Sequence, residues 1–284
     1  MPREVTIANL QTRPMPNFSK ALSEAFVLMD RAVGDGANLL CLPEYCGGLK
    51  TDGAAFAPPH APESEHPVVN GLRDYAAKHG IDILIGSVAV TGRGPKFKNR
   101  GFYVDRSGEI LSRYDKIFLF DVNLSETEMY RESDRVEPGN QAIVAETRFG
   151  RIGQSICYDL RFGQLYRDLA QAGAEILFCP AAFAVPTGQA HWHTLNRARA
   201  IENGAFMISP CAYGAVPGGG ASYGHSLIVD PWGEILSDGG SAAGVTMATI
   251  NLDLVASTRK RIASLQHDRK YTITNEVALS SAAE

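Results

Sequence analysis

Three segments in the first half of this chain return, in the same order, in its second half. Each pair joins segments of similar sequence that lie between 123 and 137 residues apart: 36–43 with 173–180, 72–87 with 195–210, and 104–112 with 229–237. The third pair reads VDRSGEILS against VDPWGEILS. Repetition at nearly constant spacing points to a duplicated structural unit. The alternative is that apolar strands ending in turn residues look alike in any α/β protein, which explains one such pair more easily than three.

The repeated unit alternates strands with helices. Residues 5–10 and 38–44 are short apolar runs typical of buried strands, and residues 18–33 have the apolar spacing of an amphipathic helix. Gly80 and Gly204 end two matching helical stretches, where glycine commonly terminates a helix. This order predicts an α/β fold in which two similar halves pack sheet against sheet, with the helices outside.

Composition and charge exclude several classes of protein. Hydrophobic residues make up 45% of the 284 residues and charged residues 20%, as in ordinary globular proteins. The formal charge of −4 gives no electrostatic reason to expect a nucleic-acid or membrane partner. No apolar run approaches the roughly 18 residues of a membrane span, and no signal peptide is evident. We expect a cytoplasmic protein with one domain over residues 1–270 and a tail, 271–284, that either frays or packs on a partner subunit.

Cysteine is the first candidate for chemistry. The chain has five cysteines, an odd number that favours free thiols over a disulfide framework. Cys157 follows an apolar strand and precedes a helical pattern, and the start of a helix would lower the pKa of its thiol. The alternative is a buried inert thiol, which is the interpretation we give to Cys41 and Cys179 within strands. Cys46 and Cys211 stay undecided.

Two further ionisable residues come at strand ends. Glu44 directly follows Pro43, which cannot donate to a central strand ladder and so marks the end of the sheet. Lys116 closes the strand that leaves the first hairpin. If the strands run in the predicted directions, these ends meet on one side of the sheet, where open α/β sheets bind ligands.

Evidence for a cofactor is weak. His191 and His193 could ligate a metal, but this spacing on a helix points the two imidazoles to different faces, and no third ligand has matching spacing. Residues 92–94 (GRG) are not followed by a helix and lack a complete phosphate-binding fingerprint. We therefore expect no metal and no nucleotide cofactor.

Three motifs together resemble the nitrilase superfamily of carbon–nitrogen hydrolases: LPEYCGG around Glu44, YDKIFLFD around Lys116 and GQSICYDLRFGQLYR around Cys157. The stretches 185–206 and 221–238 are similar to the amidase branch, which includes omega-amidases and deaminated-glutathione amidases. The resemblance implies a four-layer α-β-β-α sandwich that forms a homodimer or a higher homo-oligomer. It also implies thiol-dependent hydrolysis of a small linear amide to a carboxylate and ammonia.

The resemblance carries the family's roles to individual positions. It implies that Cys157 is the nucleophile, that Glu44 is the general base and acid, and that Lys116 stabilises the oxyanion. Glu132 falls where the family often has a second glutamate that positions the substrate amide and the lysine. Its alternative is an ordinary surface acid between two arginines.

Substrate contacts are assigned to two residues near the nucleophile. The backbone N–H of Tyr158 would assist the oxyanion, and Arg161 would face a carboxylate on the substrate or serve only the structure. Nitrile hydrolysis and N-carbamyl hydrolysis use the same Glu-Lys-Cys triad and remain open. A non-catalytic binding protein on this fold is the alternative from another class.

Overall fold

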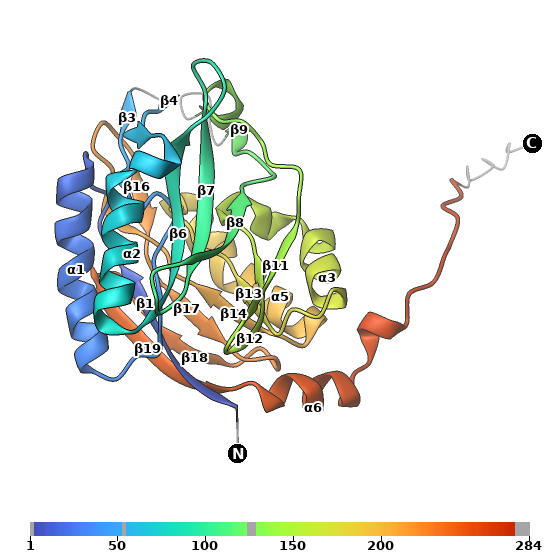
Figure 1. Ribbon diagram of the computed structural model, residues 1–284. Coiled ribbons are helices and arrows are strands. Elements are labelled where there is room, and N and C mark those ends of the chain that lie inside the picture. Colours follow the sequence, from blue (N-terminus) through green and yellow to red (C-terminus); the bar gives the residue numbers. More distant parts are fainter. Residues whose placement is uncertain (1–2, 53–54, 124–128, 276–284) are drawn as a thin grey trace, which may run out of the picture.

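The computed structural model describes residues 3–52, 55–123 and 129–275, and its core is two β-sheets packed face to face (Figure 1). Along the first sheet the strands are β19 (Gly244–Asn251), β1 (Glu4–Gln11), β2 (Leu39–Cys41), β6 (Asp82–Thr91), β7 (Phe97–Val104) and β8 (Ile110–Asp115). Along the second they are β11 (Ile143–Thr147), β12 (Gly150–Gln154), β13 (Ile176–Phe178), β14 (Phe206–Ser209), β17 (Leu227–Val229) and β18 (Ile235–Asp238).

The two sheets have the same pattern of strand directions. In each, an antiparallel outer pair is followed by two parallel pairs and then by two antiparallel pairs. The register shifts at Val104 in the first hairpin and at Val229 in the second, which are matching positions of the third repeated segment. The predicted duplication is therefore confirmed strand by strand.

Helices cover the outer face of each sheet, as Figure 1 shows. They are α1 (Phe18–Gly34) and α2 (Pro67–His79) on the first sheet, and α3 (Gly163–Gln171) and α5 (His193–Asn203) on the second. Gly80 and Gly204 end α2 and α5 in the left-handed conformation, with φ of 64° and 51°, as predicted. Glycine lacks the Cβ that makes this conformation unfavourable for other residues.

Alternate residues of the central strands face different layers. On β2, Leu40 packs towards the helices of the first half, whereas Leu39 and Cys41 join a core that lies between the sheets. On β13, Ile176 and Phe178 enter that same central core, and the residue between them faces the helices of the second half. Three apolar layers between four layers of secondary structure make the α-β-β-α sandwich.

Shorter elements decorate this sandwich. The short strands are β3 (Thr51–Asp52) with β4 (Ala55–Phe56), β9 (Asp121–Asn123) with β10 (Met129–Arg131), β15 (Tyr213–Ala215) with β16 (Ala221–Tyr223), and β5 (His60–Ala61) beside β6. The short helices are 3-10 turns at Glu63–Glu65, Glu132–Asp134, Cys157–Arg161 and Ser264–Gln266, the turn α4 (Val185–Thr187) and a π-helical turn at Gly188–Trp192. The last long helix, α6 (Asp253–Arg261), leads to an extended C-terminal segment that stands away from the body in Figure 1.

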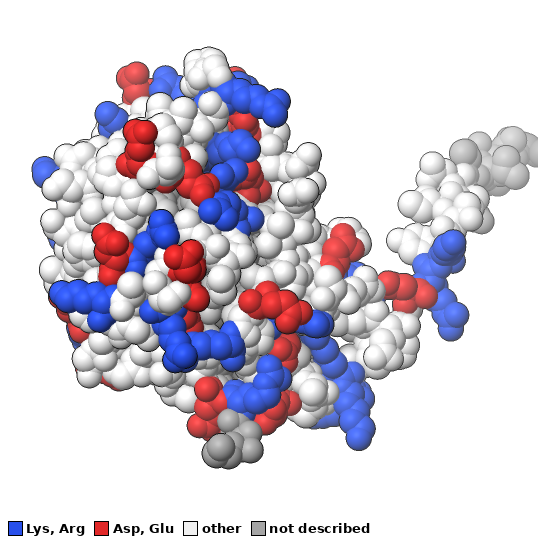
Figure 2. Space-filling view, in the orientation of Figure 1, with Lys and Arg blue, Asp and Glu red and all other residues white. Residues whose placement is uncertain are grey.

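Charged side chains of both signs share the molecular surface. Lys and Arg side chains are interspersed with Asp and Glu over the face drawn in Figure 2. Among the described residues, no helix combines the length and apolarity that crossing a bilayer requires.

Candidate active site

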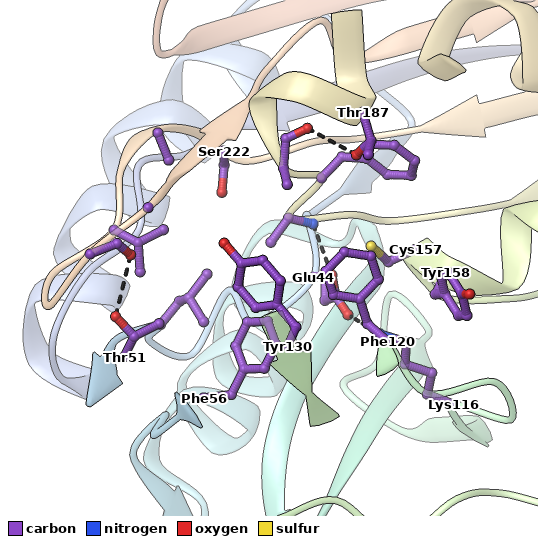
Figure 3. A pocket seen from close by; sticks show the side chains of 18 residues that line it. Glu44, Thr51, Phe56, Lys116, Phe120, Tyr130, Cys157, Tyr158, Thr187 and Ser222 are labelled. Carbon is purple, nitrogen blue, oxygen red and sulfur yellow. Dashed lines mark hydrogen bonds and ion pairs between the residues drawn. The ribbon is translucent and has the colours of Figure 1, made fainter. Parts of the chain in front are cut away.

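Glu44, Lys116 and Cys157, which are far apart in the sequence, line one pocket where loops of the two halves meet (Figure 3). Glu44 follows β2, Lys116 follows β8, and Cys157 comes three residues after β12. Each residue therefore leaves a strand end, as predicted, and the two sheets bring these ends together. The three side chains are 3%, 2% and 8% exposed, so their charges interact with little screening by water.

Glu44 is held by donors from both halves. Its Oε1 accepts from Lys116 Nζ and from Asn99 Nδ2, each at 2.9 Å. Its Oε2 accepts from the backbone N–H of Ala182 at 2.9 Å. These bonds fix the carboxylate in one orientation towards the pocket.

Glu132 is part of the same cluster. Its carboxylate accepts from Lys116 Nζ at 2.9 and 3.1 Å, and it also accepts from the Tyr45 hydroxyl at 3.2 Å and from Phe120 N at 2.6 Å. Glu132 is 1% exposed, which rules out the alternative of an ordinary surface acid. Burial alone would lower the pKa of Lys116, but the charges of Glu132 and Glu44 outweigh burial and raise the pKa, so the ammonium is retained.

Cys157 sits in a strained turn. Its φ is 50°, in the left-handed region that non-glycine residues rarely occupy. Its backbone N–H donates to Pro180 O at 2.9 Å, which ties the turn to the end of β13. Residues held in this region cluster at functional sites, where the surrounding structure stabilises them. The predicted strand-to-helix turn is confirmed, although a short 3-10 helix precedes α3.

The predicted lowering of the Cys157 pKa is wrong. Burial raises the pKa of the thiol, the negative charge of Glu44 raises it further, and the opposing effect of Lys116 is smaller. The five-residue 3-10 helix that begins at Cys157 is too short to offset burial. The resting form is therefore a thiol that needs a base.

The other four cysteines are also buried and free. Burial raises the pKa of Cys46, Cys179 and Cys211 to about 12 and raises the pKa of Cys41 as well. The interpretation of Cys41 and Cys179 as inert core thiols is consistent with this, and Cys46 and Cys211 join them.

Asp159 connects the turn of Cys157 to the segment that follows Lys116. Its carboxylate accepts from Ile156 N at 2.8 Å, from Phe118 N at 2.9 Å and from the Tyr114 hydroxyl at 2.6 Å. Burial raises the pKa of Asp159 to about 6, although all three of these hydrogen bonds act in the opposite direction. Asp159 thereby fixes the nucleophile turn relative to Lys116.

The rest of the pocket wall is mainly aromatic and apolar. Phe56, Phe120, Tyr130 and Phe183 surround the space in front of Cys157, and the loop 216–220 between β15 and β16 contributes part of the wall. Ser222 points its hydroxyl into the pocket in Figure 3, is 2% exposed, and its Oγ has no hydrogen-bond partner among the described residues.

The two predicted substrate contacts differ in position. Tyr158 lines the pocket, whereas Arg161 is not among the lining residues and lies next to two of them, its guanidinium carbon 5.7 Å from the Tyr158 ring centroid and 5.5 Å from that of Phe183. Arg161 also approaches His191 Nδ1 at 3.4 Å. Substrate binding by either residue stays a prediction.

A histidine cluster lies outside the pocket lining. His193 Nε2 is 3.0 Å from one oxygen of Asp238, and His225 Nδ1 is 2.9 Å from the other. His191 is absent from this cluster, as its different helix face predicts. Because each imidazole can donate to the shared carboxylate, hydrogen bonding alone accounts for the arrangement.

The family model of carbon-nitrogen hydrolases matches residues 6–260. The chain belongs to the carbon–nitrogen hydrolase family. The structure of the Caenorhabditis elegans NitFhit protein has a TM-score of 0.85 with this carbon–nitrogen hydrolase at 29% sequence identity, over 94% of this chain and 65% of that one. The four-layer fold expected from the three motifs is thus confirmed, and the chain spans about two thirds of NitFhit.

Two curated relatives are similar over nearly their full length. A deaminated glutathione amidase of Synechocystis is 39% identical over 266 residues, which is 92% of this chain and 96% of the relative. An omega-amidase NIT2 of Xenopus tropicalis is 32% identical over 87% of this chain and 88% of the relative.

The sequence did not reveal several residues of the cluster. Asn99, Tyr45 and the backbone N–H of Ala182 contact the carboxylates, and Asp159 holds the turn of Cys157, yet none stood out as a candidate. Asp159 could have been predicted most easily, because it lies two residues after Cys157 at the start of a helical turn. Asn99 gives no local signal, because its partners are distant in the sequence.

Proposed function

We propose that this protein is a thiol amidase that hydrolyses a small linear amide to a carboxylate and ammonia. The observation that carries the proposal is the presence of Cys157, Glu44 and Lys116 in one buried pocket, with Glu132 beside the lysine. The relatives named as amidases support the same reaction class. In this proposal, residues 1–270 form the hydrolase domain, and the chemistry needs no cofactor.

The first step uses the acid–base pair. Because the Cys157 thiol is protonated at rest, Glu44 takes its proton as the sulfur attacks the amide carbonyl carbon. A C–S bond forms, and the carbonyl electron pair moves onto oxygen. Lys116 and the backbone N–H of Tyr158 stabilise this oxyanion, and loss of one such donor typically costs roughly 10²–10³ in rate.

The second step releases ammonia, and the third regenerates the enzyme. Protonated Glu44 gives its proton to the amide nitrogen, the C–N bond breaks and a thioester remains on Cys157. Glu44 then takes a proton from water as the water oxygen attacks the thioester, and it returns that proton to sulfur when the C–S bond breaks. Glu132 keeps Lys116 in place through both tetrahedral intermediates.

Arg161 is proposed to receive a carboxylate of the substrate. It lies over the rings of two lining residues, and among the described residues no carboxylate pairs with its guanidinium. Such an arginine suits the carboxylates of omega-amides of keto acids and of deaminated glutathione. Arg161→Gln should raise KM for these substrates by about tenfold and leave KM for neutral aliphatic amides unchanged.

Ammonia release from a panel of amides tests the reaction. The panel contains omega-amides of keto acids, deaminated glutathione, aliphatic amides, nitriles and N-carbamyl compounds. Cys157→Ser should lower kcat/KM by about 10⁴-fold or more, whereas Cys41→Ala, which alters a thiol of the central core, should keep most of the activity. Hydroxylamine trapping and mass spectrometry should place the acyl group on residue 157.

The results of this panel decide between the proposed activities. Turnover of nitriles or N-carbamyl compounds in preference to amides would show that the protein is not primarily an amidase. Equal activity of the wild type and Cys157→Ser would reject Cys157 as the nucleophile. No turnover of any compound, together with no acyl group trapped on residue 157, would favour a binding protein.

A homodimer in the cytoplasm is part of the proposal. Exposed apolar side chains gather on the second half around α5, α6 and the β17–β18 hairpin, including Ile201, Trp232 and Ile262 at 50–54% exposure. Tyr271, in the predicted tail, is 85% exposed. Free thiols suit a reducing compartment. Light scattering should give a dimer that Ile201→Glu dissociates, whereas Val27→Glu, at a more exposed apolar position on α1, should not.

A further inference from the structure

Asn99 lies at the centre of the charged cluster, although it carries no charge itself. It belongs to β7 and is fully buried. Its Nδ2 is 2.9 Å from Glu44 Oε1 and 3.4 Å from Glu132 Oε1, so one amide group contacts both carboxylates. Its backbone carbonyl accepts from Lys116 N at 3.0 Å. A single residue therefore contacts both carboxylates through its side chain and the backbone of Lys116 through its carbonyl oxygen.

The charge count of the cluster explains why an amide is needed there. Two carboxylates share one ammonium, which leaves a net charge of −1 in a buried site. Repulsion between like charges favours protonation of one carboxyl, and a protonated Glu44 could not accept the thiol proton. N–H groups directed at the carboxylates favour their ionised forms without adding a second cation.

The orientation of the Asn99 amide leaves its oxygen atom without a hydrogen-bond partner in the described part of the chain. With Nδ2 directed at the carboxylates, Asn99 Oδ1 is buried without a hydrogen-bond partner among the described residues. A buried acceptor without a partner gives up the hydrogen bond that water makes to it in the unfolded chain. The flipped amide would place Oδ1 against two carboxylate oxygens and would lose both contacts of Nδ2, so the cluster selects the observed orientation although it leaves Oδ1 without a partner in the described ranges.

We infer that Asn99 is a positioning residue that keeps Glu44 ionised next to Glu132 and aligned with Lys116. This inference rests on the proposed function, because it assumes that Glu44 acts as the base. Asn99 itself does not contact the reacting atoms.

Asn9 provides a matched control. It is also fully buried in the first sheet, its Nδ2 donates to one acceptor, Leu227 O, at 2.9 Å, and its Oδ1 likewise lacks a partner among the described residues. The difference is that Asn9 contacts a neutral carbonyl, whereas Asn99 contacts two carboxylates. Replacing Asn99 or Asn9 by Leu removes one buried amide in each case and puts a side chain of similar size in its place.

The test is the pH profile of kcat/KM for the preferred amide of the wild-type protein. Asn99→Leu should move the acidic limb to higher pH by about one unit and lower the plateau by about 10- to 100-fold. Asn9→Leu should leave the limb in place. If Asn99→Leu does not fold, Asn99→Ala removes the same donor without placing a branched apolar side chain beside the carboxylates and should shift the limb in the same direction.

An unshifted limb in a folded Asn99 variant, or an equal shift in Asn9→Leu, would overturn the inference. Failure of the proposed function is a separate result, because the wild-type protein would then show no amide hydrolysis that depends on Cys157.

Discussion

The first sheet and the second sheet arrange their strands in the same order, yet the segments at their strand ends carry different chemistry. After β2, Pro43 is followed by Glu44; after the matching β13, Pro180 is followed by Ala181 and then by Ala182, whose N–H donates to that glutamate. The first half thus supplies the carboxylate, and the second half supplies a donor for it. The duplicated scaffold fixes where side chains emerge but does not determine which ones do.

The helices differ in a related way. In the first half, α1 and α2 begin at side-chain caps, since Asn17 accepts from Lys20 N and His66 accepts from Val69 N. In the second half, α3 and α5 begin after Phe162 and Trp192 without such caps. Those two rings instead pack against aromatic residues of the pocket region, with ring centroids 3.6 Å apart for Phe118 and Phe162 and 4.9 Å apart for Phe183 and Trp192. At α5 no cap is needed, because this helix continues directly from the π-helical turn Gly188–Trp192, whereas α3 begins without a side-chain cap and with a stacked aromatic pair instead.

Glu44→Gln should have the largest effect on this division of roles. The amide keeps the shape of the side chain but cannot take the thiol proton, so kcat/KM should fall by roughly 10²–10⁴-fold. Glu63→Gln is the control, because Glu63 is a carboxylate of the first half that pairs with Arg100 and Arg113 away from the pocket lining. Comparable losses in both variants would show that the loss at Glu44 reflects general destabilisation.

Asp159→Asn tests the hydrogen bonds by which Asp159 links the Cys157 turn to the segment after Lys116. The measured quantity is the pH dependence of the free energy of unfolding. The pKa of Asp159 is raised by burial to about 6 from an ordinary value of 3.8, so the folded state binds this proton more tightly than the unfolded state. The associated stability is present below about pH 4 and is lost as the pH rises through 6. A shift of this size corresponds to about 3 kcal/mol.

Urea unfolding of the wild type and Asp159→Asn at several pH values measures this effect. The free energy of unfolding of the wild type should fall relative to that of the variant between pH 4 and 6, because only the wild type loses the proton. A constant difference across this range would contradict the raised pKa.

Ser222→Ala compares the two sides of the pocket. The Ser222 hydroxyl, from the second half, has no partner among the described residues, whereas Thr51 Oγ1, from the first, donates to Gly219 O at 3.3 Å. Removing the unsatisfied hydroxyl should raise the free energy of unfolding by about 1 kcal/mol and raise KM up to tenfold for amides whose oxygen atoms bind it. Thr51→Val should lower stability instead. Reduced stability and an unchanged KM of Ser222→Ala would argue against an unsatisfied Ser222 hydroxyl that binds the substrate.

Asn17→Ala should have the smallest effect and should be confined to the first half. Loss of the N-cap of α1 should lower the free energy of unfolding by about 1 kcal/mol. The kcat/KM of the folded protein should stay unchanged, because α1 contributes no residue to the pocket lining. A parallel loss of kcat/KM would show that the scaffold and the site are coupled more closely than the comparison suggests.

Features that local sequence patterns encode could be predicted from the sequence. The repeated VD…GEILS segments predicted matching hairpins, the glycines at 80 and 204 predicted helix ends, and Pro43 predicted the sheet end that presents Glu44. These features depend on neighbours in the chain. The motifs resembling the carbon–nitrogen hydrolases then supplied the order of the four layers.

Properties that depend on distant neighbours were not accessible in this way. The Cys157 pKa goes up rather than down because the sandwich buries the thiol beside Glu44, which is 113 residues earlier in the sequence. Burial of Glu132, the bridging amide of Asn99 and the pairing of His193 and His225 through Asp238 likewise arise only when separate loops meet.

The outer strand of the first sheet has a consequence for biosynthesis. Every residue of β1, from Glu4 to Gln11, pairs with β19, which spans Gly244–Asn251. As the ribosome makes the chain, the first residue of β19 follows the first residue of β1 by 240 residues (244 − 4), so β1 has no partner on this side until that stretch has been synthesised. Such an edge is a template for pairing with other nascent chains. The first sheet is therefore completed only after the strands of the second sheet have been made, and a chaperone could protect the bare edge of β1 during this interval.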